Sequence, residues 1–398
     1  MDIIERFLKY VSYETTSSEE IREGKASSDN QYVLAEEIKK DVLALGGQNV
    51  SINKYGTVYG YFPGEIKRDP ICLIAHMDTS PSASGKNIKP RIIENYDGLD
   101  IPLSDTTIMK VSDFPTLKEN KGDTLIVTDG NTLLGADDKA GIAIILDVVR
   151  YFVENKIPHS PIEVCFSTDE EVGQGAEHVD LSVIKSKFGY TVDGGDIRYL
   201  AIENFNAASM HLDINGRSIH PGSAKDKMIN ALNVGIDFQN DLPRFMRPED
   251  TEDREGFFHL LHMEGDEEKA SMDYIVREHN LSRLHSMLDY ARLAAKRIND
   301  KYNSTIIDLH IKETYLNMKP ELDKHPEVVG KITDIYKKMN LPYFFEPIRG
   351  GTDGASLTYK GFPCPNLGTG GYNYHGRFEY EDVTQMKKMV EIIAHLFD

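Results

Sequence analysis

Cysteine is scarce in this chain, and the few cysteines are not paired in sequence. There are three, Cys72, Cys165 and Cys364, with no Cys-x-x-Cys spacing among them. An odd, unpaired set argues against a disulfide framework and indicates a reducing compartment. The first apolar stretch, residues 2–11, carries both acidic and basic side chains, so a secretory signal peptide is not expected. We therefore expect a cytoplasmic protein.

Long hydrophobic runs and excess positive charge are also missing. No window approaches about 18 consecutive apolar residues, the length typical of a membrane-spanning helix, so no membrane partner is expected. The 45 Lys and Arg residues against 64 Asp and Glu residues give a formal net charge of −19. Binding to nucleic acid needs clustered basic side chains, so no nucleic-acid partner is expected either. The acidic balance fits cationic partners, including metal ions.

Several common catalytic signatures are absent as well. The chain has no Gly-x-Ser-x-Gly, no Gly-x-x-x-x-Gly-Lys, no His-Glu-x-x-His and no Gly-x-Gly-x-x-Gly. The glycine-rich stretch 349–355 lacks the lysine of a phosphate-binding loop and carries Asp353 instead. Arg349 in this stretch suits the binding of a substrate carboxylate, although an ordinary surface arginine fits the spacing equally well.

What the chain does contain is an alternation of apolar strands and helical patterns. Buried-strand candidates at 71–75, 162–167 and 190–192 are separated by helical segments such as 141–153. This order predicts an α/β fold, a mostly parallel sheet with helices on both faces.

A different pattern begins near residue 207. Residues 210–215 alternate with a period of two, and the order that follows is strand, helix, strand, strand, helix, strand. We predict an inserted α+β (split βαβ, ferredoxin-like) domain at 208–317. A discontinuous catalytic domain would comprise residues 1–207 and 318–398.

Five short clusters carry residues suited to chemistry. Each has a plain structural interpretation: a strand-end histidine, a helix-capping aspartate or acids in a solvated loop. Asp137 and Asp138 cannot be told apart from their spacing. The clusters contain His76 with Asp78, Asp137 with Asp138, Glu170 with Glu171, Asp193, and His375.

The joint placement of these clusters is more informative than any one of them. Most follow directly after a predicted strand, and ligands of open α/β sheets bind outside the carboxyl ends of the strands. Histidines and carboxylates gathered there would form a mixed nitrogen and oxygen site suited to Zn²⁺, Mn²⁺ or Co²⁺. Two such ions about 3.5–4 Å apart form a known hydrolytic arrangement. Asp78 would then orient the ring of His76.

At these motifs the sequence resembles the di-metal (zinc) peptidase family that includes glutamate carboxypeptidases and aminoacylase-type deacylases. The resemblance covers essentially the whole chain, and the stretches around Asn204, Arg349 and Tyr372 point to the tripeptide aminopeptidases within that family. The chain departs from the family pattern at two positions. Thr168 stands where the family usually has proline, and Asp196 stands where a third glycine is common, which adds a negative charge.

The resemblance implies a role for each cluster. Two divalent ions per subunit are expected, most simply Zn²⁺, with Co²⁺ or Mn²⁺ as alternatives. Asp137, not Asp138, would bridge them, Asp78 would support His76, and Glu170 would be the general base. The implied ligands are His76, Asp137 and Asp193 for one metal and Asp137, Glu171 and His375 for the other.

The resemblance also makes the inserted domain a lid that forms a homodimer. His220 would approach the site to stabilise the oxyanion. Arg277 and Arg349 would hold the terminal carboxylate of the peptide, and Asn206 is a further expected substrate contact.

The expected function is a metal-dependent aminopeptidase that releases the N-terminal residue of tripeptides. A dipeptidase, a carboxypeptidase or an N-acyl-amino-acid deacylase on the same scaffold is an alternative. A catalytically silent peptide- or metal-binding module is the alternative outside enzymes, but its sign would be a missing ligand or base, and none is missing here.

Overall fold

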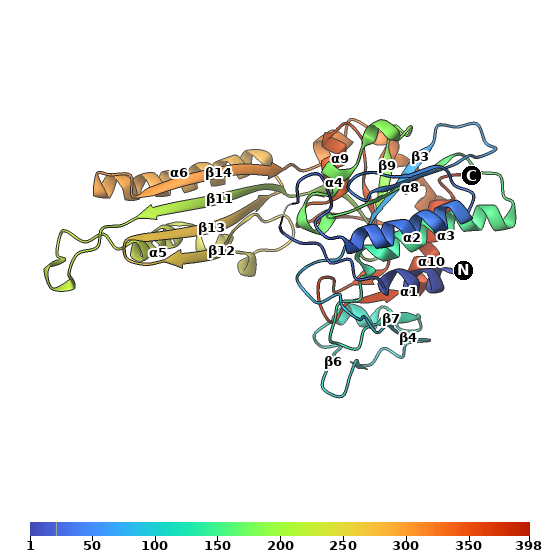
Figure 1. Ribbon diagram of the computed structural model, residues 1–398, viewed down its shortest axis with the longest axis horizontal. Helices are drawn as coiled ribbons and strands as arrows, with labels where there is room; N and C mark the ends of the chain where they lie inside the picture. The colour runs from blue at the N-terminus through green and yellow to red at the C-terminus, as the bar shows by residue number, and fades with distance from the viewer. Residues whose placement is uncertain (21) are drawn as a thin grey trace. The chain divides into compact units, whose positions relative to one another are not determined.

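The computed structural model describes residues 1–20 and 22–398. The chain divides into two compact units (Figure 1). The first comprises residues 1–202, 321–346 and 352–398, and the second comprises residues 203–320 and 347–351. The second unit thus begins at Glu203, ahead of the start at 208 expected from the sequence, and includes the short segment that contains Arg349.

The first unit is built on an eight-stranded sheet. Its inner strands β8, β3, β9 and β16 run parallel, whereas β1, β2 and β10 pair antiparallel. Strand β3 is buried along its whole length, with Leu73 and Ala75 in one core cluster and Cys72 and Ile74 in another. In order across the sheet, the strands are β1 (Gln48–Ile52), β2 (Val58–Phe62), β8 (Ile162–Ser167), β3 (Ile71–His76), β9 (Gly189–Val192), β16 (Asn366–Leu367), β10 (Tyr199–Asn204) and β15 (Phe344–Ile348).

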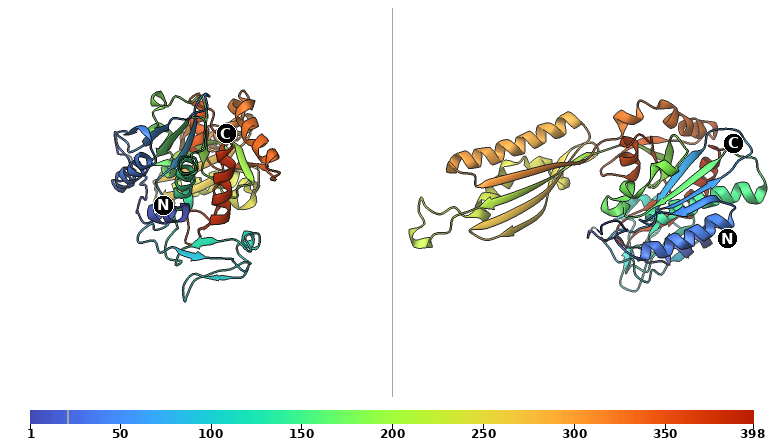
Figure 2. Two further views of the ribbon diagram at one scale, coloured as in Figure 1. Left: turned by 90° about the vertical axis from the view of Figure 1, so that its right-hand side faces the viewer. Right: turned by 45° about the horizontal axis from the view of Figure 1, so that its top comes forward.

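Helices cover both faces of this sheet, which confirms the predicted α/β class. The apolar helix α3 packs on β3 and is itself flanked by α1 and α10 (Figures 1 and 2). A smaller core on the other face contains all three cysteines, each unpaired and buried. The first core takes in α1 (Ile3–Val11), α2 (Asn30–Ala44), α3 (Ala136–Asn155), α8 (Pro326–Lys338) and α10 (Val383–Ala394); the second takes in α4 (Gly175–His178) and α9 (Asp353–Tyr359).

A second, smaller sheet in this unit was not anticipated from the sequence. It brings the segment 371–382 against residues 91–127, and its outer face has a small core of its own. Its order is β17 (Gly371–Tyr372), β18 (Tyr380–Asp382), β7 (Leu125–Val127) and β4 (Arg91–Ile93); a hairpin of β5 (Ile101–Pro102) and β6 (Ile108–Met109) lies apart from it. The sheet matters because the loop that carries His375 connects β17 to β18.

The second unit is a four-stranded antiparallel sheet with two helices on one face (Figures 1 and 2). Alternate residues of the central strand, Met210, Leu212 and Ile214, enter the core beneath the helices. The order along the chain is the predicted one: β11 (Asn206–Asn215), α5 (Ala231–Asp241), β12 (Phe257–Gly265), β13 (Lys269–Glu278), α6 (Leu281–Tyr302) and β14 (Ile307–Tyr315).

The remaining elements are short. They are α7 (Lys319–Leu322) and the 3₁₀ turns Pro115–Lys118, Glu170–Val172, Leu181–Val183, Pro221–Ser223, Arg244–Met246 and Pro248–Asp250. In the part of the chain that the structure describes, no helix combines the length and apolarity needed to cross a membrane.

Candidate metal centre

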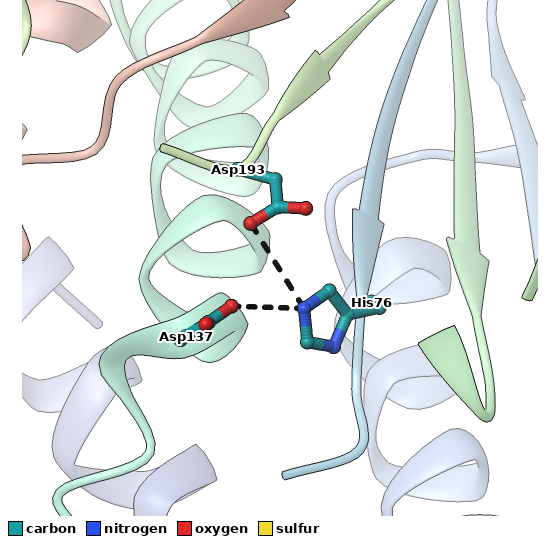
Figure 3. Close-up of side chains that lie close together, drawn as sticks. All are labelled: His76, Asp137 and Asp193. Atoms are coloured by element: carbon teal, nitrogen blue, oxygen red, sulfur yellow. Dashed lines mark hydrogen bonds and ion pairs between the residues drawn. The ribbon is translucent and has the colours of Figure 1, made fainter. Parts of the chain in front are cut away.

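The first group of potential ligands is assembled where parallel strands end. His76 is the last residue of β3, and Asp193 follows the neighbouring parallel strand β9. The His76 Nε2 atom lies 2.9 Å from Asp137 Oδ1 and 3.9 Å from Asp193 Oδ1 (Figure 3). Asp137 comes from the first turn of α3, whose helix packs behind these strands. Three residues that lie far apart in sequence therefore face one point.

A second group shares Asp137 with the first. The Nε2 atom of His375 lies 3.2 Å from Asp137 Oδ2 and 2.9 Å from Glu171 Oε2. In each group, one ligand atom per residue lies within 4.8 Å of the others. Asp137 thus presents one oxygen to each histidine, the arrangement that a bridging carboxylate between two ions requires.

The chemistry of these donors fits a pair of divalent cations. Imidazole nitrogens with carboxylate oxygens suit Zn²⁺, Co²⁺ or Mn²⁺. The Oε1 atom of Glu171 is buried and has no hydrogen-bond partner among the described residues. Buried carboxylates that crowd together require a cation or a proton. The Oε1 atom of Glu171 is therefore available to bind a metal ion.

Without metal, protons take the place of the cations. Burial, and next the charge of Asp137, raises the pKa of Asp193 to about 8. Hydrogen bonds to Asp137 and then Glu171 raise the pKa of His375 to about 10. Both groups therefore hold a proton at neutral pH in the metal-free protein.

Metal binding should consequently release protons and strengthen as the pH rises. Ligands bind metal in their deprotonated forms, and Asp193 and His375 must each lose a proton to coordinate. We expect at least one proton released per chain at pH 7, and a zinc affinity that increases from pH 6 to pH 8. Calorimetric titration in buffers of different ionisation enthalpy measures both quantities. An affinity independent of pH, with no proton released, would contradict this assignment.

Asp78 connects the first histidine to the Glu170–Glu171 turn. Its two oxygens accept hydrogen bonds from the backbone N–H groups of Glu170 and Glu171, each at 3.1 Å. The same carboxylate lies 3.3 Å from Nδ1 of His76. Asp78 is fully buried, so it sets the orientation of the ring and of the turn together.

The Glu170–Glu171 turn is held from behind by residues that the sequence analysis missed. Asp169 has φ 60°, a left-handed conformation that is uncommon outside glycine. Its carboxylate accepts hydrogen bonds from the Ser27 N–H at 2.7 Å, from the Ser27 hydroxyl and from Gln31 Nε2 at 2.6 Å. Its own N–H donates to Gln31 Oε1 at 3.1 Å. No local signal links residues so far apart in the chain.

Removing this support should destabilise the protein. In a Gln31→Ala variant the buried N–H of Asp169 loses its acceptor, at a cost of about 1–3 kcal/mol. Urea unfolding of the metal-free protein measures the change. Gln48→Ala, at an exposed position on β1, is the matched control and should change stability by less than about 0.5 kcal/mol. Equal stabilities of the two variants would refute the supporting role of Gln31.

The structure separates the two adjacent aspartates. The carboxylate of Asp137 faces both histidines, whereas that of Asp138 accepts the backbone N–H of His76 at 3.2 Å and of Gly141 at 3.1 Å. Asp138 therefore ties the start of α3 to β3 and points away from the ligand groups.

Glu379 is a further residue that the sequence analysis missed. Its carboxylate accepts the backbone N–H groups of Leu134, Gly135 and Asp137 at 2.6, 3.0 and 3.2 Å. It thereby holds the loop that presents Asp137. Its only sequence signal is its position shortly after His375.

The two departures from the family pattern are both accommodated. The Thr168 hydroxyl donates to the carbonyl of Tyr55 at 2.9 Å. The Asp196 carboxylate forms an ion pair with Arg198 through more than one guanidinium nitrogen, and Arg198 Nε lies 2.9 Å from Asp196 Oδ1. The added negative charge is therefore compensated.

The remaining predicted site residues lie in the second unit. His220 is exposed, and its Nδ1 accepts the N–H of Gly222 at 3.2 Å. Arg277 donates to the carbonyls of Ala208 and Val276 at 3.3 and 3.1 Å.

Asn206 and Arg349 are engaged by backbone groups of the same unit. Asn206 Nδ2 donates to the carbonyls of Glu278 and His279 at 3.0 and 2.8 Å. Arg349 donates to the carbonyls of Asp253 and Glu255 at 2.8 and 3.1 Å. In these contacts both side chains brace the backbone.

Comparisons with known proteins agree with this architecture. The model of "Peptidase family M20/M25/M40" matches residues 126–398. A protein named Peptidase T from Caldanaerobacter subterraneus subsp. tengcongensis is 42% identical over 401 residues, covering 100% of this chain and 98% of the relative. Peptidase T from Clostridium botulinum (strain Loch Maree) is 44% identical over 400 residues, covering 99% and 98%.

Solved structures share the fold. The aminopeptidase PepT from Bacillus cereus superposes with a TM-score of 0.77 at 21% identity, covering 99% of this chain and 96% of that chain. A tripeptidase from Staphylococcus aureus gives a TM-score of 0.77 at 20% identity with the same coverage. With the family model matching well over half of its length and relatives more than 40% identical along all of it, the chain belongs to peptidase family M20/M25/M40.

Proposed function

We propose that this protein is a metal-dependent tripeptide aminopeptidase that hydrolyses the bond after the N-terminal residue. The observation that carries the proposal is the pair of ligand groups sharing Asp137, with Glu170 in the adjacent turn. The full-length similarity to proteins named Peptidase T supports the choice of tripeptides among the substrates of the family.

Two divalent cations would occupy the centre, with Zn²⁺ preferred and Co²⁺ or Mn²⁺ as alternatives. Such ions would lower the pKa of a bound water molecule and polarise the scissile carbonyl. Asp78 holds the ring of His76 and the Glu170–Glu171 turn in fixed positions relative to each other. His76, Asp137 and Asp193 would hold one ion, and Asp137, Glu171 and His375 the other.

Glu170 is proposed as the general base. Its carboxylate takes a proton from the attacking water and returns it to the nitrogen of the leaving peptide. Burial, against a smaller opposing effect of His76, raises its pKa well above the ordinary value. A pKa shifted in this direction makes the carboxylate a stronger base.

The second unit is proposed to complete the site and to form a homodimer. His220, exposed beside a 3₁₀ turn, would stabilise the oxyanion. Arg277 and Arg349 are proposed to hold the terminal carboxylate of the peptide, and Asn206 is proposed as a further substrate contact. Three unpaired, buried cysteines support a reducing, cytoplasmic location.

A substrate panel tests this function. Metal-loaded protein should cleave a free Ala-Gly-Gly-type tripeptide, and a chelator should abolish the activity until metal is restored. A free dipeptide and an N-acetylated amino acid should be poor substrates. Preference for the dipeptide would indicate a dipeptidase, and preference for the acetylated compound a deacylase. No turnover of any substrate by the metal-loaded protein would favour the silent binding module.

A further inference from the structure

A cavity of about 220 Å³ lies in the first unit, beside the second ligand group. Glu171 belongs both to the wall of this cavity and to that ligand group. A molecule in the cavity would therefore lie next to the metal centre. The volume suits one amino-acid side chain, since pockets that enclose drug-sized ligands measure about 300–1,000 Å³.

His178, the last residue of α4, supplies the one nearly buried imidazole of the cavity wall. Its exposed fraction is only 8%, and its ring stacks on Tyr55 with centroids 4.2 Å apart and an interplanar angle of 9°. Its Nδ1 atom lies 3.1 Å from the Thr168 hydroxyl and 3.5 Å from Asp169 Oδ2. Nε2 has no hydrogen bond or ion pair among the described residues. With Nδ1 and one ring face engaged, Nε2 is the polar atom left to face the cavity.

The neighbours of Nδ1 fix the tautomer of this ring. The Thr168 hydroxyl donates its only proton to the carbonyl of Tyr55 at 2.9 Å, so its oxygen can only accept from His178. Nδ1 therefore carries a hydrogen. Burial lowers the pKa of His178 below its ordinary value, so the ring is neutral at pH 7 and Nε2 is a hydrogen-bond acceptor. The cavity thus offers an acceptor that a bound donor can satisfy.

The charged groups of the wall give little preference for a charged occupant. The Asp169 carboxylate is already engaged by the hydrogen bonds described above, and Arg22 is paired with Asp29 at 2.7 Å. Glu19 and Lys25 are exposed and opposite in charge. The best match to the cavity is therefore a neutral side chain that ends in a hydrogen-bond donor.

The reaction indicates which residue of the peptide this side chain belongs to. In aminopeptidase hydrolysis the scissile carbonyl belongs to the N-terminal residue. That residue is consequently the one closest to the metal ligands, of which Glu171 also lines the cavity.

We propose that this cavity receives the side chain of the N-terminal residue of the substrate, and that His178 determines specificity there. Hydroxyl and amide side chains, which can donate a hydrogen bond to Nε2, are the preferred class. The proposal rests on the tripeptide aminopeptidase function given above and adds the side-chain preference to it.

Pairs of tripeptides that differ only in the donor test the subsite. Thr-Ala-Gly is compared with Val-Ala-Gly, and Asn-Ala-Gly with Leu-Ala-Gly, because the members of each pair have nearly the same shape. The ratio of kcat/KM within each pair is measured for the wild type and for His178→Phe, which keeps an aromatic ring on Tyr55 but lacks Nε2. His159→Phe is the matched control, since His159 is also buried and lies against an aromatic ring, that of Phe152, but does not line this cavity.

We expect the wild type and His159→Phe to favour the donor peptide of each pair about 2- to 12-fold, the effect of one neutral hydrogen bond. In His178→Phe the ratio should fall to about 1 or below. Zinc content and turnover of Ala-Gly-Gly show whether each variant is folded and loaded with metal.

The wild-type ratios test the proposal even if His178→Phe does not fold. Ratios of 1 or below in the wild type, or an unchanged preference in folded His178→Phe, would overturn the subsite. So would a preference that appears only when threonine and valine are exchanged at the second position of the peptide. If Ala-Gly-Gly is cleaved in these cases, the proposed function stands and only the subsite is lost. If the metal-loaded wild type cleaves no tripeptide, both are wrong.

Discussion

Replacing Glu170 with glutamine is expected to lower kcat for tripeptide hydrolysis about 100- to 10,000-fold, the range that general acid–base catalysis contributes. Glutamine has nearly the same size and shape but cannot accept the proton of the attacking water. The backbone N–H of residue 170 would still donate to Asp78, so the turn should keep its conformation. Both ligand groups are left unaltered by this substitution.

The decisive measurement combines kinetics with metal analysis. Glu170→Gln should retain the full complement of metal, whereas Glu171→Gln should lose metal together with activity. Glu177→Gln, at an exposed position on the neighbouring helix α4, controls for the loss of one negative charge near the site and should remain active. Unchanged turnover in metal-replete Glu170→Gln would rule out Glu170 as the base.

Exchanging Asp137 for asparagine is expected to remove both metal ions at once. Asp137 is the only residue common to the two ligand groups, and its oxygens lie 2.9 Å from His76 and 3.2 Å from His375. An amide cannot supply two anionic oxygens to two cations. We expect zinc affinity to fall at least about 100-fold at both positions, equivalent to about 2.7 kcal/mol each.

The adjacent residue is the matched control for this substitution. Asp138→Asn should keep both ions, because the Asp138 carboxylate accepts the N–H groups of His76 and Gly141 and points away from the ligands. Its expected effect is a loss of stability of about 1–3 kcal/mol from a disturbed buried hydrogen-bond pair. Equilibrium dialysis with zinc and urea unfolding separate the two variants. Loss of both ions from Asp138→Asn with retention in Asp137→Asn would reverse the assignment.

The predicted fold class follows from features that short stretches of sequence already contain. A strand buried on both faces reads as a continuous apolar run, as Ile71–His76 does. A strand with one open face reads as an alternation, as in Asn206–Asn215. The small sheet of β17, β18, β7 and β4 lacked such a signal, because its strands are only two or three residues long.

The gathering of site residues was also predictable in part. Polar residues directly after buried parallel strands meet at one edge of a sheet, and His76 and Asp193 lie close together for this reason. The family resemblance selected Asp137 over Asp138, a choice that spacing alone left open. In the structure, Asp137 faces both histidines.

Composition and pattern by themselves determined the acidic character of the chain, the parallel sheet, the inserted antiparallel unit and the set of histidines and carboxylates available for metal. Only the tertiary structure decided how these side chains are held. The support of Asp169 by Gln31, that of the Asp137 loop by Glu379, and the stacking of His178 on Tyr55 all join distant segments. Such contacts depend on strand register and on long-range packing, which no short stretch of sequence contains.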